Sequence, residues 1–262
     1  MLQIQKLNVK AAILDMDGVL WRLTTPLVDL PELFRQFDQY NVRVMFATNN
    51  GTATIDQYVM KLAGFGVSVE AWQVVTSAMA TGYALKKAFP NGGPIYIMGE
   101  KALHDTLKDF DFYHDTKAPQ AVAAGLARNF DYNMIKDASL MIQKGLPFYF
   151  TNPDPTYPTP EGNIPGAGTV LAALETASGV KAHLAGKPLP FLFELGMQRL
   201  HTTPEETLVV GDRLDTDILG GQESGCKTAM VLTGISTRDD AEKWRPQPDL
   251  IIDNVMGLFQ EA

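Results

Sequence analysis

The sequence has little cysteine and no long apolar run. Its one cysteine, Cys226, excludes an internal disulfide, and no cysteine and histidine spacing typical of a zinc site accompanies it. No apolar stretch approaches the roughly 20 residues that a membrane-spanning helix needs. Residues 1–10 are too polar for the apolar region of a signal peptide. We therefore expect an unprocessed, soluble protein of the reducing cytoplasm with no membrane partner.

Positive charge is also scarce. Lys and Arg together number 22 against 30 Asp and Glu, which gives a formal net charge of −8. Such a chain repels a phosphate backbone wherever its surface is not locally basic, so nucleic-acid polymers are poor partner candidates. Apolar residues, by contrast, make up 45% of the 262 positions. That share predicts a folded core in one large domain or two ordinary ones, and it excludes disordered and fibrous classes.

Short apolar runs alternate with segments of helical periodicity. Runs typical of buried strands lie at 11–14, 44–47, 208–210, 229–232 and 250–252, and a second series lies at 95–98, 121–123, 140–142 and 148–150. Between the first two runs, apolar residues recur three and four positions apart, which indicates a helix over 29–40. This alternation predicts an α/β fold with parallel sheets covered by helices. Ligands of such sheets gather at the carboxyl ends of the strands.

Two stretches indicate that one α/β domain interrupts another. Residues 89–94 are rich in Pro and Gly, which is typical of a domain boundary and also of an ordinary surface loop. A second boundary is expected near 178–182. We therefore predict a core made of residues 1–86 and 182–262, with an inserted domain over 87–181.

Two carboxylates follow the first apolar run. Asp15 and Asp17 stand two residues apart, and Gly18 ends the strand directly after them. At a strand end the turn lets both side chains converge, and such a pair can hold a divalent cation and divide the roles of nucleophile and proton shuttle. The alternative is a plain turn that ends the strand. These residues alone leave both interpretations open.

Two further segments place polar groups after apolar runs. Thr48 and Asn49 lie before a helical segment, where hydroxyl, amide and backbone N–H groups suit phosphate oxygens, although the same residue types also form turns and caps. Lys187 precedes Pro188, which disfavours helix at the lysine. Its ammonium either offsets a carboxylate and a phosphoryl group held together or is an ordinary solvated charge.

The fourth segment carries three carboxylates within six residues. Asp212, Asp215 and Asp217 follow the apolar run that ends at Gly211. One of them can be a helix cap, but three caps in one turn are not expected. Oxygen ligands that converge with Asp15 would suit Mg²⁺, which leaves room for substrate oxygen and water.

Together, the four segments resemble the motifs of the haloacid dehalogenase superfamily of phosphatases. D-M-D-G-V at 15–19 is similar to the nucleophile motif, T-N-N at 48–50 to the phosphate motif, G-K-P at 186–188 to the lysine motif and G-D-R-L-D-T-D at 211–217 to the metal motif. The long insertion resembles the α/β cap of the NagD-like branch, which comprises p-nitrophenyl, sugar and nucleotide phosphatases. The resemblance implies a Rossmann-like core with an inserted cap domain.

The resemblance also implies a role for each motif residue. Asp15 would be the nucleophile that receives the phosphoryl group, and Asp17 the general acid and base. Thr48 and Asn49 would hold the phosphate, and Lys187 would neutralise charge. Mg²⁺ would be bound by Asp15, the backbone carbonyl of Asp17 and Asp212. Asp217 would orient the metal's surroundings or Lys187, and Asp215 is left as a helix-start or supporting group.

The implied function is a Mg²⁺-dependent phosphomonoesterase that acts on a small phosphorylated metabolite through an aspartyl phosphate. The substrate class would be a sugar phosphate, a nucleotide or a phosphoglycolate-like ester. Two alternatives stay open: a phosphomutase of the same superfamily, and a catalytically idle module that binds a phosphometabolite. Caps of this branch often contribute to dimer contacts, so a homodimer is also open.

The expected specificity element of the cap is the segment 150–158. It carries three prolines, which stiffen a loop and lower the entropy lost when the loop is held over a site. By the resemblance, Asp154 and Tyr157 would contact the leaving group, whereas the plain interpretation is a stiff surface connection. Cys226 is expected to be a small buried group, and Trp21 can either line the site or belong to the core.

Overall fold

The computed structural model describes residues 1–159 and 161–261, and the chain divides into two compact units. The first unit comprises Met1–Thr48, Ile55–Val75 and Phe193–Ala262, and the second comprises Asn49–Thr54 and Thr76–Leu192. Each unit is built on a parallel sheet with helices, so the predicted α/β class is confirmed. Residues 49–54, 76–86 and 182–192, which the sequence analysis assigns to the core, belong to the second unit. The functional boundaries of core and cap stay a prediction.

The elements of the first unit alternate between strand and helix. Its helices are α1 (Gln3–Leu7), α2 (Leu30–Gln39), α3 (Ile55–Gly64), α8 (Phe191–Leu200), which begins in the second unit, α9 (Leu219–Glu223) and α10 (Arg238–Lys243). Short 3₁₀ helices cover Ala71–Gln73, Pro204–Glu206 and Val255–Phe259, and a π-helix covers Leu214–Ile218. Its strands are β1 (Ala11–Leu14), β2 (Trp21–Arg22), β3 (Thr25–Pro26), β4 (Arg43–Thr48), β5 (Val74–Thr76), β13 (Thr207–Gly211), β14 (Lys227–Val231) and β15 (Leu250–Ile252).

A six-stranded sheet with the order β15-β14-β13-β1-β4-β5 forms the centre of the first unit. β1 pairs in parallel with β13 on one side and with β4 on the other. All residues of β1 and β13 are buried, as expected for strands covered on both faces. The strand order changes direction at β1, so the carboxyl ends of β1, β13 and β4 surround a topological switch point, where open α/β sheets bind ligands.

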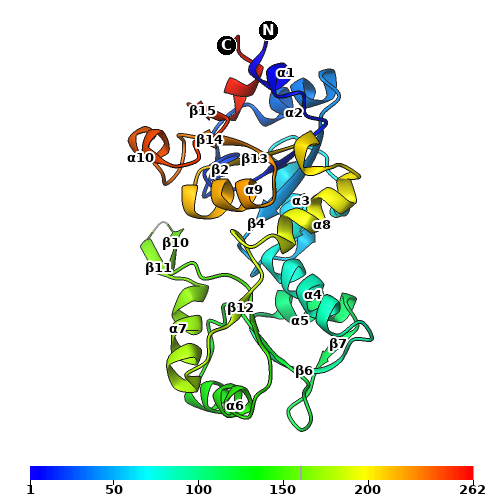
Figure 1. Ribbon diagram of the computed structural model, residues 1–262, viewed down its shortest axis with the longest axis vertical. Coiled ribbons are helices and arrows are strands. Elements are labelled where there is room, and N and C mark those ends of the chain that lie inside the picture. Colours follow the sequence, from blue (N-terminus) through cyan, green and yellow to red (C-terminus); the bar gives the residue numbers. More distant parts are fainter. Residues whose placement is uncertain (160, 262) are drawn as a thin grey trace. The chain divides into compact units, whose positions relative to one another are not determined.

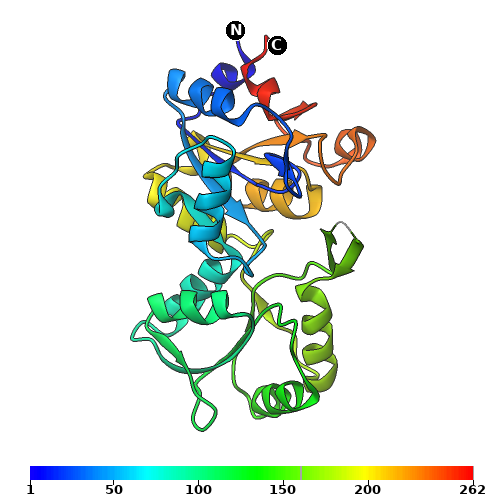
Figure 2. The ribbon, with the colours of Figure 1, turned by 180° about the vertical axis from the view of Figure 1, so that it is seen from behind.

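The expected helix over 29–40 is present as α2. Asp29 caps it, because Oδ1 of Asp29 accepts a hydrogen bond from the N–H of Glu32 at 3.0 Å. The chain ends lie side by side in both views of the ribbon (Figures 1 and 2), where the N–H of Gln3 donates to the carbonyl of Gln260 at 3.1 Å. Across residues 1–159 and 161–261, none of the helices is both long and apolar enough to span a membrane.

The second unit repeats the strand and helix alternation around a sheet of its own. Its strands are β6 (Gly93–Met98), β7 (Phe112–His114), β8 (Val122–Ala124), β9 (Phe148–Phe150), β10 (Thr156–Thr159), β11 (Gly162–Pro165) and β12 (His183–Leu184). Its helices are α4 (Ser77–Ala88), α5 (Lys101–Asp109), α6 (Tyr132–Gln143) and α7 (Ala167–Ser178). Five strands form a parallel sheet in the order β12-β9-β8-β6-β7, and β10 and β11 form an antiparallel hairpin. α6 and α7 lie next to each other and pack on one core cluster (Figure 1).

One expected strand is wrong. Residues 140–142 belong to α6, which Asp131 caps by accepting a hydrogen bond from the N–H of Met134 at 2.9 Å. Ala138 and Ile142 are buried four residues apart, while Leu140 between them is exposed. That spacing is helical, and the short apolar run hid it because a three-residue window does not distinguish the two periods.

Candidate active site

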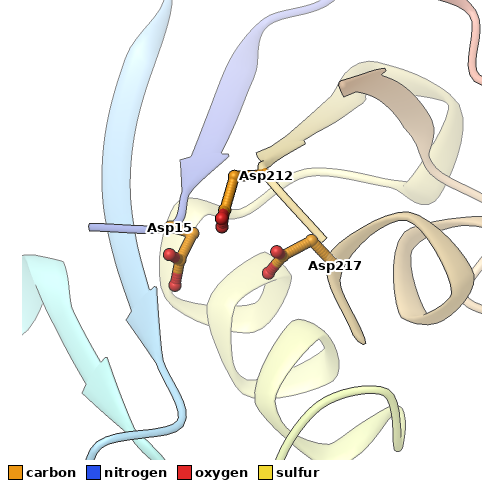
Figure 3. A group of neighbouring side chains, drawn as sticks. All are labelled: Asp15, Asp212 and Asp217. Carbon is orange, nitrogen blue, oxygen red and sulfur yellow. The ribbon is translucent and has the colours of Figure 1, made fainter. Parts of the chain in front are cut away.

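Two aspartates stand at the carboxyl ends of adjacent strands. Asp15 directly follows β1 and Asp212 directly follows β13, and the parallel register of these strands brings the two residues to the same edge of the sheet. The N–H of Asp15 donates to the carbonyl of Val210 at 2.9 Å, which continues the hydrogen bonding between the two strands up to Asp15. The side chains of Asp15 and Asp212 lie beside each other and near that of Asp217 (Figure 3).

The carboxylates of Asp15, Asp212 and Asp217 form a compact carboxylate cluster. One oxygen from each lies within 4.8 Å of the others. Asp15 is 9% exposed, Asp212 3% and Asp217 2%, so water screens their mutual repulsion only weakly. A positive charge among three buried anions at this separation would offset their repulsion. All donor atoms are carboxylate oxygens, which is the ligand type that Mg²⁺ prefers, so the residues fit the expected cation.

The loop after β14 and the turn after β1 enclose Asp212. Oδ2 of Asp212 accepts a hydrogen bond from the N–H of Ile235 at 2.8 Å, and its carbonyl accepts one from the N–H of Ser236 at 3.0 Å. A Cβ at Gly18 would lie 2.6 Å from Oδ2 of Asp212, and a Cβ at Gly234 would lie 1.8 Å from it. Glycine is required at both positions, because any side chain would displace the carboxylate.

Asp217 reaches the cluster from the π-helix that begins at Leu214. The N–H groups of Asp217 and Ile218 both bond to the carbonyl of Arg213, at 3.1 and 3.2 Å, which widens the turn. Oδ2 of Asp217 accepts a hydrogen bond from the N–H of Arg213 at 3.2 Å. The sequence places Asp217 in a supporting role, and the geometry puts its carboxylate beside the two expected metal ligands.

Asp215 belongs to a different interaction. Its two carboxylate oxygens accept hydrogen bonds from Nε and Nη2 of Arg213 at 3.1 and 2.9 Å. This bidentate bond holds the pKa of Asp215 below its usual value. Asp215 is outside the carboxylate cluster and therefore supports the loop around Arg213.

Asp17 is exposed, and its carboxylate is not a member of the carboxylate cluster. Its Oδ1 accepts a hydrogen bond from the indole N–H of Trp21 at 2.9 Å. Gly18 turns the chain between them with φ of +87°, a conformation that favours glycine. The indole of Trp21 thus holds one oxygen of the Asp17 carboxylate.

Thr48 ends β4, the strand beside β1, and is buried. The phenol of Tyr58, from α3, is hydrogen-bonded to Thr48. Burial and the negative charges of Asp17 and Asp15 raise the pKa of Tyr58, so its hydroxyl keeps its proton. Tyr58 is a neighbour of the site that the sequence analysis missed. It lies one turn into the helix that follows T-N-N, and this position in the sequence could have indicated that it lies near Thr48.

Asn49 and Lys187 come together in the second unit. Oδ1 of Asn49 accepts a hydrogen bond from the N–H of Lys187 at 2.7 Å, and its Nδ2 donates to the carbonyl of Lys187 at 3.1 Å. A Cβ at Gly186 would lie 2.6 Å from Oδ1 of Asn49. The amide of Asn49 therefore fixes the lysine loop, and phosphate binding by Asn49 stays a prediction.

The expected specificity segment continues into the β10–β11 hairpin. Oδ2 of Asp154 accepts a hydrogen bond from Nδ2 of Asn152 at 2.8 Å. The hydroxyl of Tyr157 accepts hydrogen bonds from Nε and Nη2 of Arg128 at 3.3 and 3.2 Å. Glu100 also pairs with Arg128, at 3.4 Å. Arg128 and Glu100 were not singled out in the sequence, because they follow different strands that only the sheet brings together.

Two family profiles match the chain. One, described as a haloacid dehalogenase-like hydrolase, covers residues 12–113, and a second, described as HAD-hydrolase-like, covers residues 184–258. They include the nucleophile and phosphate motifs and the lysine and metal motifs, respectively. The segment between the profiles contains much of the second unit.

Curated relatives and solved structures match nearly the whole chain. The ribonucleotide monophosphatase NagD of Escherichia coli K12 is 31% identical over 96% of this chain and 99% of its own length. The dihydroxyacetone phosphatase of Corynebacterium glutamicum is 30% identical over 93% of this chain and 88% of its own length. The structure of the glycerol phosphate phosphatase of Mycobacterium tuberculosis in complex with magnesium matches with a TM-score of 0.91 at 31% identity, covering 100% of this chain and 79% of that one.

The resemblance drawn from the four motifs is therefore confirmed by relatives that extend through the inserted segment. The family follows from the aligned length as well as from the carboxylate cluster at the switch point. The chain belongs to the haloacid dehalogenase-like hydrolases, in their NagD-like branch.

Proposed function

We propose that the protein hydrolyses small phosphate monoesters through a phosphorylated Asp15, with Mg²⁺ as its cofactor. One observation carries this proposal: three buried carboxylates, those of Asp15, Asp212 and Asp217, converge at the switch point of the first sheet. The phosphatase names of its relatives support the reaction class. Bound Mg²⁺ would be held by the carboxylate cluster, and it supplies positive charge against the phosphate oxygens.

The reaction divides into two displacements. In the first, a carboxylate oxygen of Asp15 forms a bond to phosphorus while the ester P–O bond breaks, and Asp17 gives its proton to the leaving oxygen. In the second, Asp17 takes a proton from water as the water oxygen attacks phosphorus, and the bond between Asp15 and phosphorus breaks. Inorganic phosphate and the alcohol are the products, and both aspartates return to their starting states.

The other motif residues are assigned binding roles. We assign Thr48, supported by the Tyr58 hydroxyl, to the phosphate oxygens. Lys187 would neutralise charge on the phosphoryl group, and Asn49 would keep the lysine loop in place through its two hydrogen bonds. With these roles, most of the rate enhancement would come from positive and polar groups positioned around the phosphoryl group.

The substrate class is a small metabolite with a hydroxyl-bearing or acidic leaving group. The relatives are named as a ribonucleotide monophosphatase, a dihydroxyacetone phosphatase and a D-glycerol 3-phosphate phosphatase, and the groups in these names all carry hydroxyls. A sugar phosphate, nucleotide or phosphoglycolate-like ester is proposed. We further infer a cytoplasmic enzyme, and the homodimer stays a prediction.

Phosphate release tests the function. Purified protein with Mg²⁺ should release inorganic phosphate from p-nitrophenyl phosphate and from some member of a metabolite panel, and EDTA should stop the release. The Asp15→Asn variant controls for contaminating phosphatases. If the wild-type protein released no phosphate from a broad panel, the enzyme assignment would be wrong and an idle binding module would take its place.

The alternatives are not favoured. An idle module needs a missing catalytic group, but all the motif residues are present and the carboxylate cluster is assembled. A phosphomutase of this superfamily carries a different helical cap between the first two motifs, whereas here only β2, β3 and α2 lie between β1 and β4. Hydrolysis is the reaction that fits these elements.

A further inference from the structure

We propose that Trp21 is a positioning residue for proton transfer: its indole N–H holds the carboxyl of Asp17 in the orientation that protonates the leaving group. This inference rests on the proposed function. The hydrogen bond from Nε1 of Trp21 to Oδ1 of Asp17 is 2.9 Å long. It joins a side chain with no exposed surface to an exposed carboxyl.

The backbone turn between the two residues sets this geometry. The N–H of Gly18 donates to the carbonyl of Trp21 at 2.8 Å, and the N–H of Trp21 donates to the carbonyl of Met16 at 3.3 Å. Asp17 and Trp21 also form an isolated β-bridge. Two residues four positions apart are thus closed into a small loop, and the indole can reach the carboxyl without a change of backbone.

The indole itself is fixed from α3. The ammonium of Lys61 lies 4.0 Å from the centroid of the Trp21 ring and donates to the carbonyl of Leu23 at 2.9 Å. Phe65, which directly follows α3, lies with its ring centroid 5.7 Å from that of Trp21. A cation over the ring also draws electron density from the indole, which makes its N–H a stronger donor.

The hydrogen bond from the indole determines which oxygen of Asp17 carries the proton. An indole N–H donates and cannot accept, so the oxygen it bonds serves as acceptor. With Oδ1 engaged by Trp21, Oδ2 is the oxygen that carries the proton to the ester oxygen. An exposed carboxyl without this bond would rotate among several orientations, and fewer of them would place Oδ2 within hydrogen-bond reach of the leaving group.

Leaving-group dependence distinguishes positioning from a structural role. p-Nitrophenolate departs without a proton, whereas an alkoxide needs one. Because kcat/KM covers the steps through phosphorylation of Asp15, Trp21→Phe should lower kcat/KM for an alkyl phosphate such as glycerol phosphate by about tenfold or more. For p-nitrophenyl phosphate the decrease should stay below about threefold. An equal decrease for both substrates would assign Trp21 to packing and overturn the inference.

Trp244→Phe is the matched control. Trp244 also donates its indole N–H to a side chain, Oε1 of Gln222, at 3.1 Å, and it packs on the cluster around Ile218 and Met230. The substitution removes the same type of hydrogen bond from a partly buried indole, so the ratio of the two kcat/KM values should not change. A changed ratio in Trp244→Phe would show that the readout reports general loosening, and it would count against the inference.

A double-mutant cycle tests the route through Asp17. If Trp21 acts only by holding this carboxyl, Trp21→Phe should change glycerol phosphate kcat/KM by less than about twofold when Asp17 is already Asn. A full tenfold effect in that background would contradict the inference.

If Trp21→Phe fails to fold, 3-benzothienylalanine at position 21 provides a second variant, because it keeps the bicyclic ring and replaces only the N–H. The ratio of its kcat/KM values for glycerol phosphate and p-nitrophenyl phosphate then tests the inference in the same way. An active wild-type enzyme with an unchanged ratio would refute this inference alone and leave the proposed function intact.

Discussion

Asn49 holds Lys187 by two hydrogen bonds across 138 positions of the chain. Its Oδ1 accepts from the backbone N–H of Lys187 at 2.7 Å, and its Nδ2 donates to the backbone carbonyl at 3.1 Å. Both side chains are buried, with Asn49 9% and Lys187 3% exposed. The second and third motifs are therefore joined by a direct structural contact, which gives the amide beside Thr48 a structural role.

Breaking this contact should reduce both stability and activity. Asn49→Ala leaves a buried N–H and carbonyl of Lys187 without their partner, so we expect the free energy of unfolding to fall by about 1–3 kcal/mol. We also expect kcat to fall by about tenfold or more, because the lysine loop loses its position. Urea unfolding and steady-state kinetics measure the two effects. An Asn49→Ala enzyme with wild-type kcat would show that the hydrogen bonds between Asn49 and Lys187 are not needed for catalysis.

Asp15→Asn should abolish turnover while the fold persists. The amide keeps the shape of the side chain but removes the nucleophile, so activity should fall below about a hundredth of wild type. Asp215→Asn is the matched control, because it makes the same change in the loop around Arg213, outside the carboxylate cluster. Phosphate release and thermal unfolding report both variants. More than a hundredth of wild-type activity in Asp15→Asn would rule out the nucleophile assignment.

Divalent cations should stabilise the protein as well as activate it. The three buried carboxylates repel one another, so Mg²⁺ should raise Tm, and Asp212→Asn should remove most of that shift. Ca²⁺ should also raise Tm but inhibit phosphate release, because it takes more ligands at longer distances and can engage Asp15 a second time. A calcium rate equal to the magnesium rate would contradict this expectation.

The hydroxyl of Tyr157 should influence substrate choice. It accepts two hydrogen bonds from Arg128, which Glu100 also contacts, so the guanidinium is held in one orientation on the second unit. Tyr157→Ala should change relative kcat/KM among metabolite esters by about tenfold, or about 1.4 kcal/mol, and p-nitrophenyl phosphate by less. Tyr157→Phe separates the hydroxyl from the ring. A uniform change across all esters would assign Tyr157 to packing.

His104 should make the folded protein less stable in acid. Burial, and then the neighbouring His114, lower the pKa of His104, while Asp105 opposes the shift. The unfolded chain therefore binds this proton first, at about pH 6.5. Stability is fully present above that pH and is lost as the pH falls through the lowered pKa of the folded state.

His104→Gln removes the titrating group without adding a charge. Urea unfolding at about pH 7.5 and about pH 5 should show a smaller acid loss in this variant than in the wild-type protein. His201→Gln is the control, since His201 is exposed on the other unit. An identical acid loss in wild type and His104→Gln would place the acid sensitivity elsewhere.

Much of the fold was predictable because its strands and helices are marked by local sequence patterns. β1, β4 and β13 are short apolar runs whose residues are almost all buried, and the capping aspartate and apolar spacing of α2 are local as well. Residues 140–142 were mispredicted as a strand because a run of three apolar residues is too short to show the helical periodicity of α6.

The chemistry of the site was also readable from residue types, since Asp15, Asp17 and Asp212 each follow an apolar strand. The sequence did not show that these side chains lie close together. Their proximity depends on the parallel register of β1 with β13 and on the π-helix that brings Asp217 to the carboxylate cluster. The indole of Trp21 on Asp17, the amide of Asn49 on Lys187 and the pairing of Arg128 with Tyr157 are likewise tertiary. A sequence states which groups are available at strand ends, whereas hydrogen bonds between side chains are short and directional, so only the folded backbone decides which of those groups meet.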